Sequence, residues 1–490
     1  MNLRTTTTSL LLAACTAALT AQGPLTVGNL VVVTVNTGTN TSAVTLQEYS
    51  YTAAPTPTVT PVQAIVLPTA PAGANRQFTI RGAATSEGYL NVSNSGTHLV
   101  LAGYDAPPGT ANTAIEASTA AVVNRVIATV DFTGTIDTST AITDAYDGTT
   151  SFQGNIRAAT SLDGITGFWL SGTGSGSSGG VRYVGGLGQS TSLLLNAGAP
   201  SNCRVVGLYD GQLYTTSAST VYLGVCTVGT GIPTTGSQPV TLLPGFPAGG
   251  GTTAGSAYDF FWADQNTVYV ADDNSPASTV GGISKWTFNG SLWSRAYRWT
   301  VNLTPTSNWG ARGITGFTRD GVTTVWATMN DNANGTTNLV SVVDTGAGAT
   351  VNVLATAAAG TAFRGVRFLA KPTTAIRFPA ACGGSADIRF AGNGELGTDV
   401  RTTVATPAGI PLVVYGTTHL GVSVDPTCSC VLGPSLDILV ASAVSTLSIP
   451  NNVALVGVTL YTQGIDFLAG GVCNNPLPHS LTDYYSFTVQ

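Results

Sequence analysis

The sequence has very few of the side chains on which most enzyme active sites depend. Its 490 residues include two lysines, four glutamates and three histidines, which are His98, His419 and His479. None of the histidines lies in a metal-binding spacing, and no H-E-x-x-H or phosphate-loop motif occurs. This scarcity favours a binding or interaction protein over an enzyme, and no cofactor is expected.

Charge and long apolar runs are scarce as well. Charged residues make up 9% of the chain, and the formal net charge is −6 with no basic stripe, so a nucleic-acid partner is not expected. No apolar run after the N-terminus reaches the ~20 residues that a membrane-spanning helix needs. The abundance of glycine, threonine and valine instead favours strands joined by tight turns, and predicts an all-β protein.

The N-terminus resembles an export signal. Arg4 precedes a short apolar run at residues 10–19, and small residues follow it. We expect residues 1–21 to be a signal peptide that is cleaved after Ala21. The alternative is a lipoprotein box at Leu12-Ala-Ala-Cys15, which would leave a lipid anchor at Cys15. Both interpretations predict a protein that is secreted or held at the cell envelope or surface.

A repeated pattern organises most of the chain. Each copy has a short apolar strand, a turn and an alternating strand that ends near an aromatic residue. Copies begin at residues 87, 157, 204, 258 and 312, and a truncated copy begins at residue 364. Asp-Gly turns, which are a good hairpin signal, occur at Asp163-Gly164, Asp210-Gly211 and Asp320-Gly321. Four strands recurring about every 50 residues are typical of a β-propeller.

The ends of the repeat region complement each other. The N-terminal part offers three strands, at residues 30–35, 44–49 and 62–67, and the truncated copy at residue 364 supplies a missing innermost one. Pairing the last strand with the first three would close the ring and remove its exposed edges. Residues 22–372 are therefore predicted to form a six-bladed propeller, with seven blades as the alternative.

From residue 373 onward the repeat stops. Short strands separated by Gly, Pro and Asn predict a small β-sandwich over residues 373–490. Without Cys15 six cysteines remain, an even number that suggests disulfides in an exported protein. We expect a Cys203–Cys226 bond, because the two fall on strands predicted to be neighbours.

The other four cysteines all lie in the predicted sandwich: Cys382, Cys428, Cys430 and Cys473. Four cysteines allow three pairings, and the sequence leaves them open. Cys428 and Cys430 lie on one strand face, so each is expected to bond a distant partner. A zinc site is the competing interpretation, although the spacing lacks C-x-x-C pairs.

Two parts of the chain resemble groups of bacterial proteins. Three segments together resemble a C-terminal module found on many secreted bacterial proteins of unknown function: Pro379-Ala-Ala-Cys-Gly-Gly, Ile449-Pro-Asn-Asn-Val-Ala-Leu-Val-Gly and Ser480-Leu-Thr-Asp-Tyr. The repeat region resembles uncharacterised exported bacterial propellers. These resemblances imply export and a two-part architecture, but no activity and no functional residue.

Arginine recurs at one position of the repeat. Arg157, Arg204, Arg312 and Arg364 each stand at the start of an innermost strand, and Glu87 opens the strand of another copy. Innermost strands line a propeller's channel, so these side chains are expected to ring one mouth of it. Guanidinium groups suit carboxylates, sulfates and phosphates, which suggests an anionic glycan, such as a uronate or sulfated sugar, at that mouth. We favour the alternative that each arginine bonds the adjoining blade, because a recurrent residue usually serves the repeat.

Two weaker candidate sites remain. Asn330, Asn332 and Asn334 resemble the first half of a calcium loop but lack its acidic first ligand and its closing Glu, so a polar turn is favoured. Glu87 and Asp259 are the best pair of carboxylates for glycoside hydrolysis, but would come from distant blades. The predicted function is a secreted or cell-surface binding protein with a glycan or protein partner. The alternatives are an extracellular polysaccharide lyase or hydrolase, and a structural component of the cell envelope.

Overall fold

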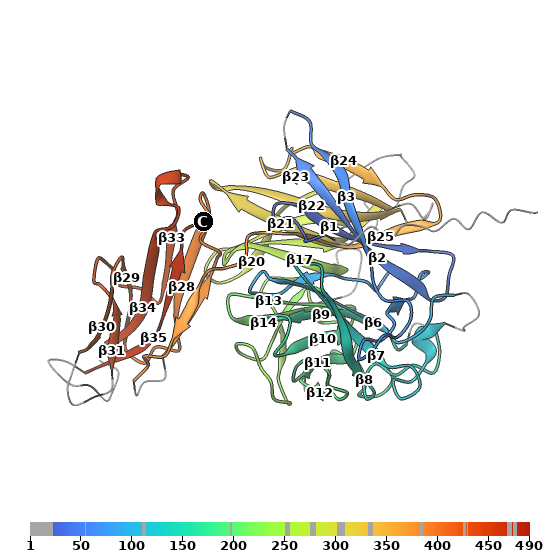
Figure 1. The fold of residues 1–490 in the computed structure, drawn as a ribbon, viewed down its shortest axis with the longest axis horizontal. Coiled ribbons are helices and arrows are strands. Elements are labelled where there is room, and N and C mark those ends of the chain that lie inside the picture. Colours follow the sequence, from blue (N-terminus) through green and yellow to red (C-terminus); the bar gives the residue numbers. More distant parts are fainter. Residues whose placement is uncertain are drawn as a thin grey trace, which may run out of the picture.

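The computed structural model describes most of the chain after the predicted signal peptide. It describes residues 23–490 except for residues 54, 110–113, 152, 197, 250–254, 275–280, 301–308, 332–336, 383–385, 425–427, 429, 468–472 and 474–477. Over these residues the protein is all-β, as predicted, and its helical elements are two 3-10 helices, η1 (Ile115–Ala117) and η2 (Val453–Leu455) (Figure 1). In the same residues, no helix has the length and hydropathy required to cross a membrane. The predicted signal peptide, residues 1–21, and the alternative lipid anchor at Cys15 lie outside the described residues.

Four separate antiparallel sheets of four strands follow one another along the chain, each with its strands in chain order. The first two contain β9 (Ile156–Ser161), β10 (Phe168–Gly172), β11 (Gly180–Val184) and β12 (Leu193–Leu194), then β13 (Cys203–Tyr209), β14 (Gln212–Ser217), β15 (Val225–Val228) and β16 (Val240–Leu242). The next two contain β17 (Ala257–Asp264), β18 (Thr267–Asp272), β19 (Gly282–Phe288) and β20 (Trp293–Trp299), then β21 (Trp309–Arg319), β22 (Val322–Asp331), β23 (Thr337–Val343) and β24 (Val351–Thr356). Repeated four-stranded sheets of this kind are the building pattern of propeller-type folds.

The first part of the chain forms a nine-stranded sheet together with a strand from residues 361–368. Its strands are β1 (Leu30–Asn36), β2 (Ser42–Thr52), β3 (Thr58–Val66), β4 (Thr79–Ile80), β5 (Asn91–Val92), β6 (His98–Tyr104), β7 (Arg125–Asp131), β8 (Ile136–Ile142) and β25 (Thr361–Phe368). β25 pairs antiparallel with β1, β3 pairs with β2, and the two-residue strand β4 joins β2 to β6. The truncated repeat copy therefore lies beside the first strand of the chain.

Two of the three predicted Asp-Gly turns form tight hairpins. Asp210 and Gly211 have φ angles of 48° and 66°, and Asp320 and Gly321 have φ angles of 49° and 74°. Positive φ at both central residues is the type I′ geometry, which matches the twist of antiparallel strands. These turns join β13 to β14 and β21 to β22. Asp163-Gly164 instead lies in a longer connection, because the pairing of β9 and β10 ends at Ser161 and Phe168.

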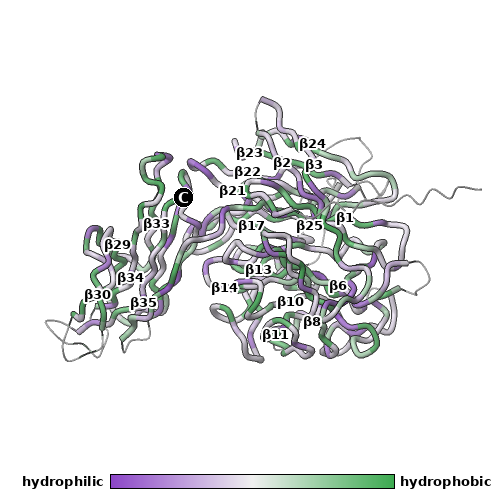
Figure 2. The backbone as a smooth tube through the Cα atoms, viewed as in Figure 1, coloured by the Kyte–Doolittle hydropathy of each residue, from purple (hydrophilic) through white to green (hydrophobic). Residues whose placement is uncertain are grey.

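The hydrophobic cores lie between successive sheets. One core joins β6 and β7 to β9 and β10, and further cores join each later sheet to the next. Another core joins β22 and β23 to β25, β1 and β2. Each sheet is therefore covered on both faces, which explains why its strands carry apolar residues. Figure 2 shows short hydrophobic and hydrophilic stretches interleaved along the chain.

The strands of residues 376–488 form a second lobe, drawn in orange to red in Figure 1. A five-stranded sheet has the order β26 (Ile376–Phe378), β35 (His479–Thr488), β34 (Thr459–Phe467), β29 (Ile410–Gly416) and β32 (Ile438–Val440). A three-stranded sheet contains β27 (Asp387–Ala391), β28 (Asp399–Ala405) and β33 (Val444–Ser448), and β30 (His419–Ser423) pairs with β31 (Val431–Pro434). Val404 of β28 shares a core with Val413 and Tyr415 of β29, so the two larger sheets pack together.

The second lobe contacts the hairpin turns that follow β13, β17 and β21. Arg401 pairs with Asp210 in the turn between β13 and β14, and donates a hydrogen bond to Gln265 Oε1 in the turn between β17 and β18 (2.7 Å). Arg319 pairs with Glu395, and the amide of Asp320 donates to the carbonyl oxygen of Gly397 (2.7 Å). This end of β13, β17 and β21 therefore faces the second lobe.

Candidate functional site

The recurring arginines converge around a pair of tyrosines. Tyr89 precedes β5, and Tyr258 is the second residue of β17, the place that Arg157 and Arg204 hold on β9 and β13. The two rings are 5.1 Å apart between centroids, and the guanidiniums of Arg204 and Arg312 lie 4.2 and 5.0 Å from the Tyr258 ring centroid. Burial raises the pKa of Tyr89, and the charges of Arg312 and Arg364 oppose that rise. The tyrosine pair fills the centre of this cluster.

Each arginine uses part of its guanidinium to bond a segment that lies far from it in the sequence. Nη1 of Arg157 donates to the carbonyl oxygen of Cys203 (2.9 Å), Nη1 of Arg204 to that of Ala257 (3.0 Å), and Nη2 of Arg364 to that of Gly82 (2.9 Å). Nη2 of Arg312 lies 3.3 Å from Asp273 Oδ2. These bonds favour the interpretation in which the arginines hold the fold together. They argue against the alternative of a glycan site at the arginine cluster.

Glu87 does not line an opening with the arginines. Its side chain is fully buried and accepts hydrogen bonds from the Tyr104 hydroxyl (2.7 Å), the Arg81 amide (2.8 Å) and the Asn155 side chain. Burial raises the pKa of Glu87, and these hydrogen bonds partly offset the effect. The expectation that Glu87 faces a ligand is wrong, because its carboxylate is already satisfied inside the protein.

The predicted calcium loop is only partly described. Asn330 lies in β22, pairs with Thr337 of β23 and is buried. Asn332 and Asn334 lie outside the described residues. Asn330, the one asparagine of this predicted loop that the structure describes, is therefore a strand residue.

The expected Cys203–Cys226 disulfide is wrong. Cys203 lies on β13 and Cys226 on β15, and both are buried free thiols. β14 pairs with both strands and separates them, which places the cysteines about two strand spacings, roughly 10 Å, apart. A disulfide requires Cα atoms within about 7 Å. Burial raises the pKa of Cys203 to about 12 and also raises that of Cys226, so neither thiol is a nucleophile at neutral pH.

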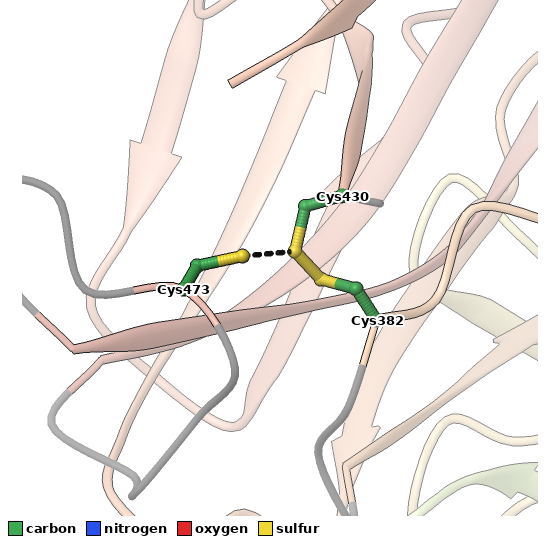
Figure 3. A group of neighbouring side chains, drawn as sticks. All are labelled: Cys382, Cys430 and Cys473. Carbon is green, nitrogen blue, oxygen red and sulfur yellow. Dashed lines mark hydrogen bonds between the residues drawn. A yellow bond between two sulfur atoms is a disulfide. The ribbon is translucent and has the colours of Figure 1, made fainter. Parts of the chain in front are cut away.

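The four remaining cysteines form two disulfides in the second lobe. Cys382 bonds Cys430 and Cys428 bonds Cys473, with sequence separations of 48 and 45 residues. Cys428 and Cys430 therefore each bond a distant partner, as predicted. Figure 3 shows Cys473 beside the Cys382–Cys430 bond, with its Sγ 2.7 Å from that of Cys430. Three of the sulfurs gather within 4.8 Å, but in disulfides they offer no thiolate for the alternative zinc site.

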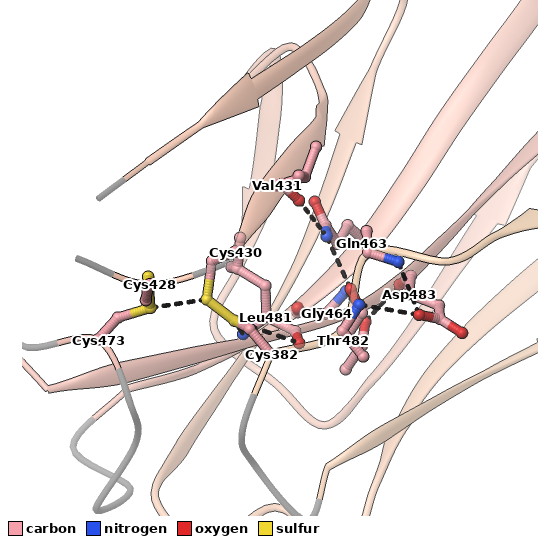
Figure 4. The surroundings of a disulfide bond; sticks show 12 residues. Cys382, Cys428, Cys430, Val431, Gln463, Gly464, Cys473, Leu481, Thr482 and Asp483 are labelled. Carbon is pink, nitrogen blue, oxygen red and sulfur yellow. Dashed lines mark hydrogen bonds between the residues drawn. A yellow bond between two sulfur atoms is a disulfide. The ribbon is translucent and has the colours of Figure 1, made fainter. Parts of the chain in front are cut away.

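The disulfides join the loops of the second lobe to its central strands. The Leu481 amide on β35 donates to Cys382 Sγ (3.3 Å). The neighbouring Gln463 on β34 donates from Nε2 to the carbonyl oxygens of Val431 (2.9 Å) and Thr482 (2.7 Å), as Figure 4 shows. Covalent and hydrogen-bonded links thus hold β31, β34 and β35 together, and this cluster is structural.

A buried polar network crosses the space between six strands that we call the inner strands: β5, β9, β13, β17, β21 and β25. Arg367 of β25 bonds both oxygens of Asp259 of β17, at 2.8 and 3.1 Å, and its Nη2 also donates to Asn91 Oδ1 (2.8 Å). Its Nη1 donates to the carbonyl oxygen of Ile314 on β21 (2.6 Å). Asn91 Nδ2 donates in turn to carbonyl oxygens on β9 and β13, those of Ala159 and Val206. One network therefore connects all six inner strands.

A cavity of about 220 Å³ opens above this network, at the end of the inner strands that faces the second lobe. We call it the central cavity. Asp259, Arg367 and Asn91 contribute its polar lining, and its aromatic lining consists of Tyr209, Phe260, Phe261, Trp262 and Phe368. Aromatic walls with a few convergent polar groups are typical of small-molecule sites. Sequence reasoning considered Asp259 only as a catalytic acid and did not consider Arg367.

A second cavity of about 640 Å³ adjoins the first through Phe368, which lines both. We call it the aromatic cleft. Tyr51, Phe317 and Trp326 complete its aromatic lining. The Trp326 ring is stacked on Phe368 and meets Tyr51 edge-on, each at 5.0 Å between centroids. The Trp326 Nε1 is buried and has no hydrogen-bond partner among the described residues.

Charged side chains lie at the edge of the aromatic cleft. Arg319 pairs with Glu395 of the second lobe, and both line the cleft. Lys371 also lines it, and none of the ion pairs among the described residues involves Lys371. The cleft thus combines an aromatic wall with an available cation. Its residues come from β2, β21, β22, β25 and the second lobe, so no local motif reveals it.

Comparisons with known proteins find only distant likenesses. No family model matches the chain, and no curated protein matches it. Among solved structures, a putative 6-phosphogluconolactonase from Bacteroides uniformis is 12% identical, with a TM-score of 0.35 over 67% of this chain and 82% of that one. AztD from Citrobacter koseri is 10% identical, with a TM-score of 0.28 over 94% and 99%. An exo-β-1,3-galactanase from Phanerochaete chrysosporium is 9% identical, with a TM-score of 0.32 over 84% and 98%. Likenesses this distant carry no inference about the activity of this chain.

Proposed function

We propose that this chain is an exported, non-catalytic binding protein that holds an acidic glycan in the aromatic cleft and the central cavity. The observation that carries the proposal is that two aromatic-lined cavities adjoin and share Phe368 as a lining residue. Sugar rings present apolar C–H faces that pack on aromatic side chains, while their hydroxyls need nearby polar groups. Both kinds of surface occur in the paired cavities.

The architecture that we propose is a six-bladed propeller followed by a β-sandwich. Apart from the two-residue strand β4, the nine-stranded sheet divides into two units of four, β25-β1-β2-β3 and β5-β6-β7-β8, which add to the four separate sheets. In this proposal the β25–β1 pairing closes the ring. The β-sandwich consists of the two larger sheets of residues 373–490. Both cavities then lie at the channel mouth opposite the arginines.

Lys371 is the proposed contact for the acidic group of the glycan. It is the one lysine of the cleft, and its ammonium group is a point charge suited to a carboxylate or sulfate. An exposed contact of this kind is weakened by salt. Binding is therefore expected to be stronger at low ionic strength, with an apolar component that salt does not remove.

Catalysis is not part of the proposal. Glu87 and Asp259, the two acids considered for hydrolysis, are each saturated by donors within the protein. Asp259 accepts the Ile314 amide as well as Arg367, and Glu87 has separate partners. Two carboxylates engaged in this way do not flank a shared space for a glycosidic bond.

The test is a glycan-array screen of the exported protein at low and high salt. We expect binding to uronate-containing or sulfated glycans that weakens in the Tyr51→Ala and Lys371→Gln variants. Matched controls are Tyr222→Ala, which removes a half-buried tyrosine elsewhere, and Arg295→Gln, which removes an exposed cation elsewhere. Absence of glycan binding by the folded wild-type protein would overturn the proposal and favour a structural or protein-interaction role.

A further inference from the structure

A small cavity lies beside the tyrosine pair, between β21–β22 and β25. Its volume is about 10 Å³, and its lining includes Arg312, Arg364, Thr328, Thr337 and Tyr89. A cavity of this size admits a single small species. It belongs to the arginine cluster and is separate from the aromatic cleft and the central cavity.

The two guanidiniums present buried N–H groups that have no partner. Nε and Nη1 of Arg312 and Nε of Arg364 make no hydrogen bond within the described part of the chain. The other nitrogens are engaged: Nη2 of Arg312 lies 3.3 Å from Asp273, and Nη1 and Nη2 of Arg364 donate to the carbonyl oxygens of Phe363 (3.3 Å) and Gly82 (2.9 Å). Arg364 is only 4% exposed. Unpaired donors on a buried cation carry a large desolvation cost, so native proteins normally satisfy them.

The remaining lining groups do not neutralise the arginines. The Thr328 hydroxyl donates to the carbonyl oxygen of Arg364 (2.6 Å) and accepts the amide of Gly313, and the Thr337 hydroxyl accepts the amide of Phe363. No carboxylate lines the cavity among the described residues. Of the nearby acids, Asp273 is shared between Arg312 and Arg204, at 3.3 and 3.6 Å, and Glu87 is bound to Tyr104.

Electrostatics at the cavity favour a negative occupant. The pKa of Arg364 is lowered to about 10, mainly by burial; Tyr89 opposes this change, and the charge of Arg312 acts in the same direction as burial. Two like charges facing a shared space repel each other, and an anion between them reverses the sign of that interaction. A water molecule would satisfy some donors but would leave the charge of Arg364 uncompensated.

We propose that this cavity binds a single small monovalent anion, chloride under physiological conditions, between Arg312 and Arg364. Sulfate, phosphate and carboxylates are too large for it. The bound anion completes the hydrogen bonding of the two guanidiniums and stabilises the junction of β25 with β21. The site does not depend on the proposed glycan function, because Arg364 precedes Phe368 on β25 and lies outside both glycan cavities.

The direct test uses wild-type crystals grown without halide and soaked in sodium bromide. We expect an anomalous bromine peak between Arg312 and Arg364. A peak at that position that lacks anomalous signal, and so indicates water, would overturn the proposal, as would an empty cavity. Since this experiment needs no variant, a folding failure cannot obscure it.

A solution measurement complements the crystals. The Tm of the wild type should rise with sodium chloride or bromide relative to sodium gluconate at equal ionic strength, because a ligand of the native state stabilises it. Arg312→Gln should lose this halide dependence, whereas the exposed control Arg76→Gln should keep it. Equal Tm values in halide and gluconate for the wild type would contradict the proposal.

Discussion

Arg367 and Asp259 form a two-point ion pair across the space between the inner strands, with Nη1–Oδ2 at 2.8 Å and Nη2–Oδ1 at 3.1 Å. The carboxylate also accepts the amides of Phe260 and Ile314. Because Arg367 lies on β25, near the end of the repeat region, the pair joins the last inner strand to a strand that begins about 100 residues earlier. The polar floor of the central cavity is thus also a structural link.

The first prediction concerns this pair. Arg367→Ala should lower the free energy of unfolding by about 3–5 kcal/mol, because it leaves the buried Asp259 carboxylate without its cation. The double variant Arg367→Met/Asp259→Leu should be less destabilised than Arg367→Ala, since it leaves no unpaired charge. Urea unfolding followed by tryptophan fluorescence measures both. A loss below about 1 kcal/mol in Arg367→Ala would show that the pair is dispensable.

The second prediction separates the arginine cluster from the glycan site. Arg204→Lys keeps the positive charge but cannot reproduce the bonds from one nitrogen to Ser256 Oγ (2.8 Å) and the Ala257 carbonyl (3.0 Å) together with the stacking on Tyr258. We expect a stability loss of about 1–2 kcal/mol and unchanged glycan affinity. Thermal and urea unfolding check the first part, and a glycan titration checks the second.

Several features of the fold follow from local sequence patterns. The hairpins at Asp210-Gly211 and Asp320-Gly321 could be predicted, because Asp-Gly between alternating strands specifies a type I′ turn. The repeated arginines could be aligned by register, and they do gather around one centre. In the second lobe, the close spacing of Cys428 and Cys430 was enough to predict that each bonds a distant partner.

Other features depend on contacts that a single sequence does not encode locally. The Cys203–Cys226 prediction failed because β14 lies between the two strands, although the chain between the cysteines is short. Glu87 was expected at an opening, but three donors from separate segments enclose it. The aromatic cleft combines residues as distant as Tyr51 and Glu395, so only the folded chain brings them together.

The third prediction concerns the cysteines. Alkylation of the native protein should label neither Cys203 nor Cys226, because both thiols are buried and burial raises their pKa. Alkylation after denaturation without reductant should label these two and leave Cys382, Cys428, Cys430 and Cys473 unlabelled. Peptide mapping by mass spectrometry gives the result. A Cys203–Cys226 linked peptide would contradict the structure, and labelling of the four cysteines of the second lobe would contradict the disulfides.

The fourth prediction is a pH dependence carried by Asp272. Burial raises its pKa to about 6 in the folded protein, although the amides of Ser256 (2.6 Å) and Asn274 (3.0 Å) donate to it. An unfolded aspartate has a pKa of about 3.9. Between about pH 4 and pH 6 the folded state therefore holds more protons at this group, so its contribution to stability falls as pH rises.

Asp272→Asn removes this term. The difference in free energy of unfolding, variant minus wild type, should increase between pH 4 and pH 6 by about 2–3 kcal/mol and then level off. Urea titrations at pH 4, 5, 6 and 7 measure it. A difference that is constant over these four pH values would show that Asp272 does not titrate in this range.

A calorimetric comparison of variants tests directly where the glycan binds. The acidic glycan selected by the array would be titrated into the wild type, Tyr51→Ala and Arg204→Lys, with the fold of each confirmed by circular dichroism. Loss of one aromatic contact predicts about tenfold weaker binding to Tyr51→Ala, with wild-type affinity for Arg204→Lys. The opposite pattern, in which Arg204→Lys loses binding and Tyr51→Ala retains it, would place the glycan at the arginine cluster and contradict the proposed site.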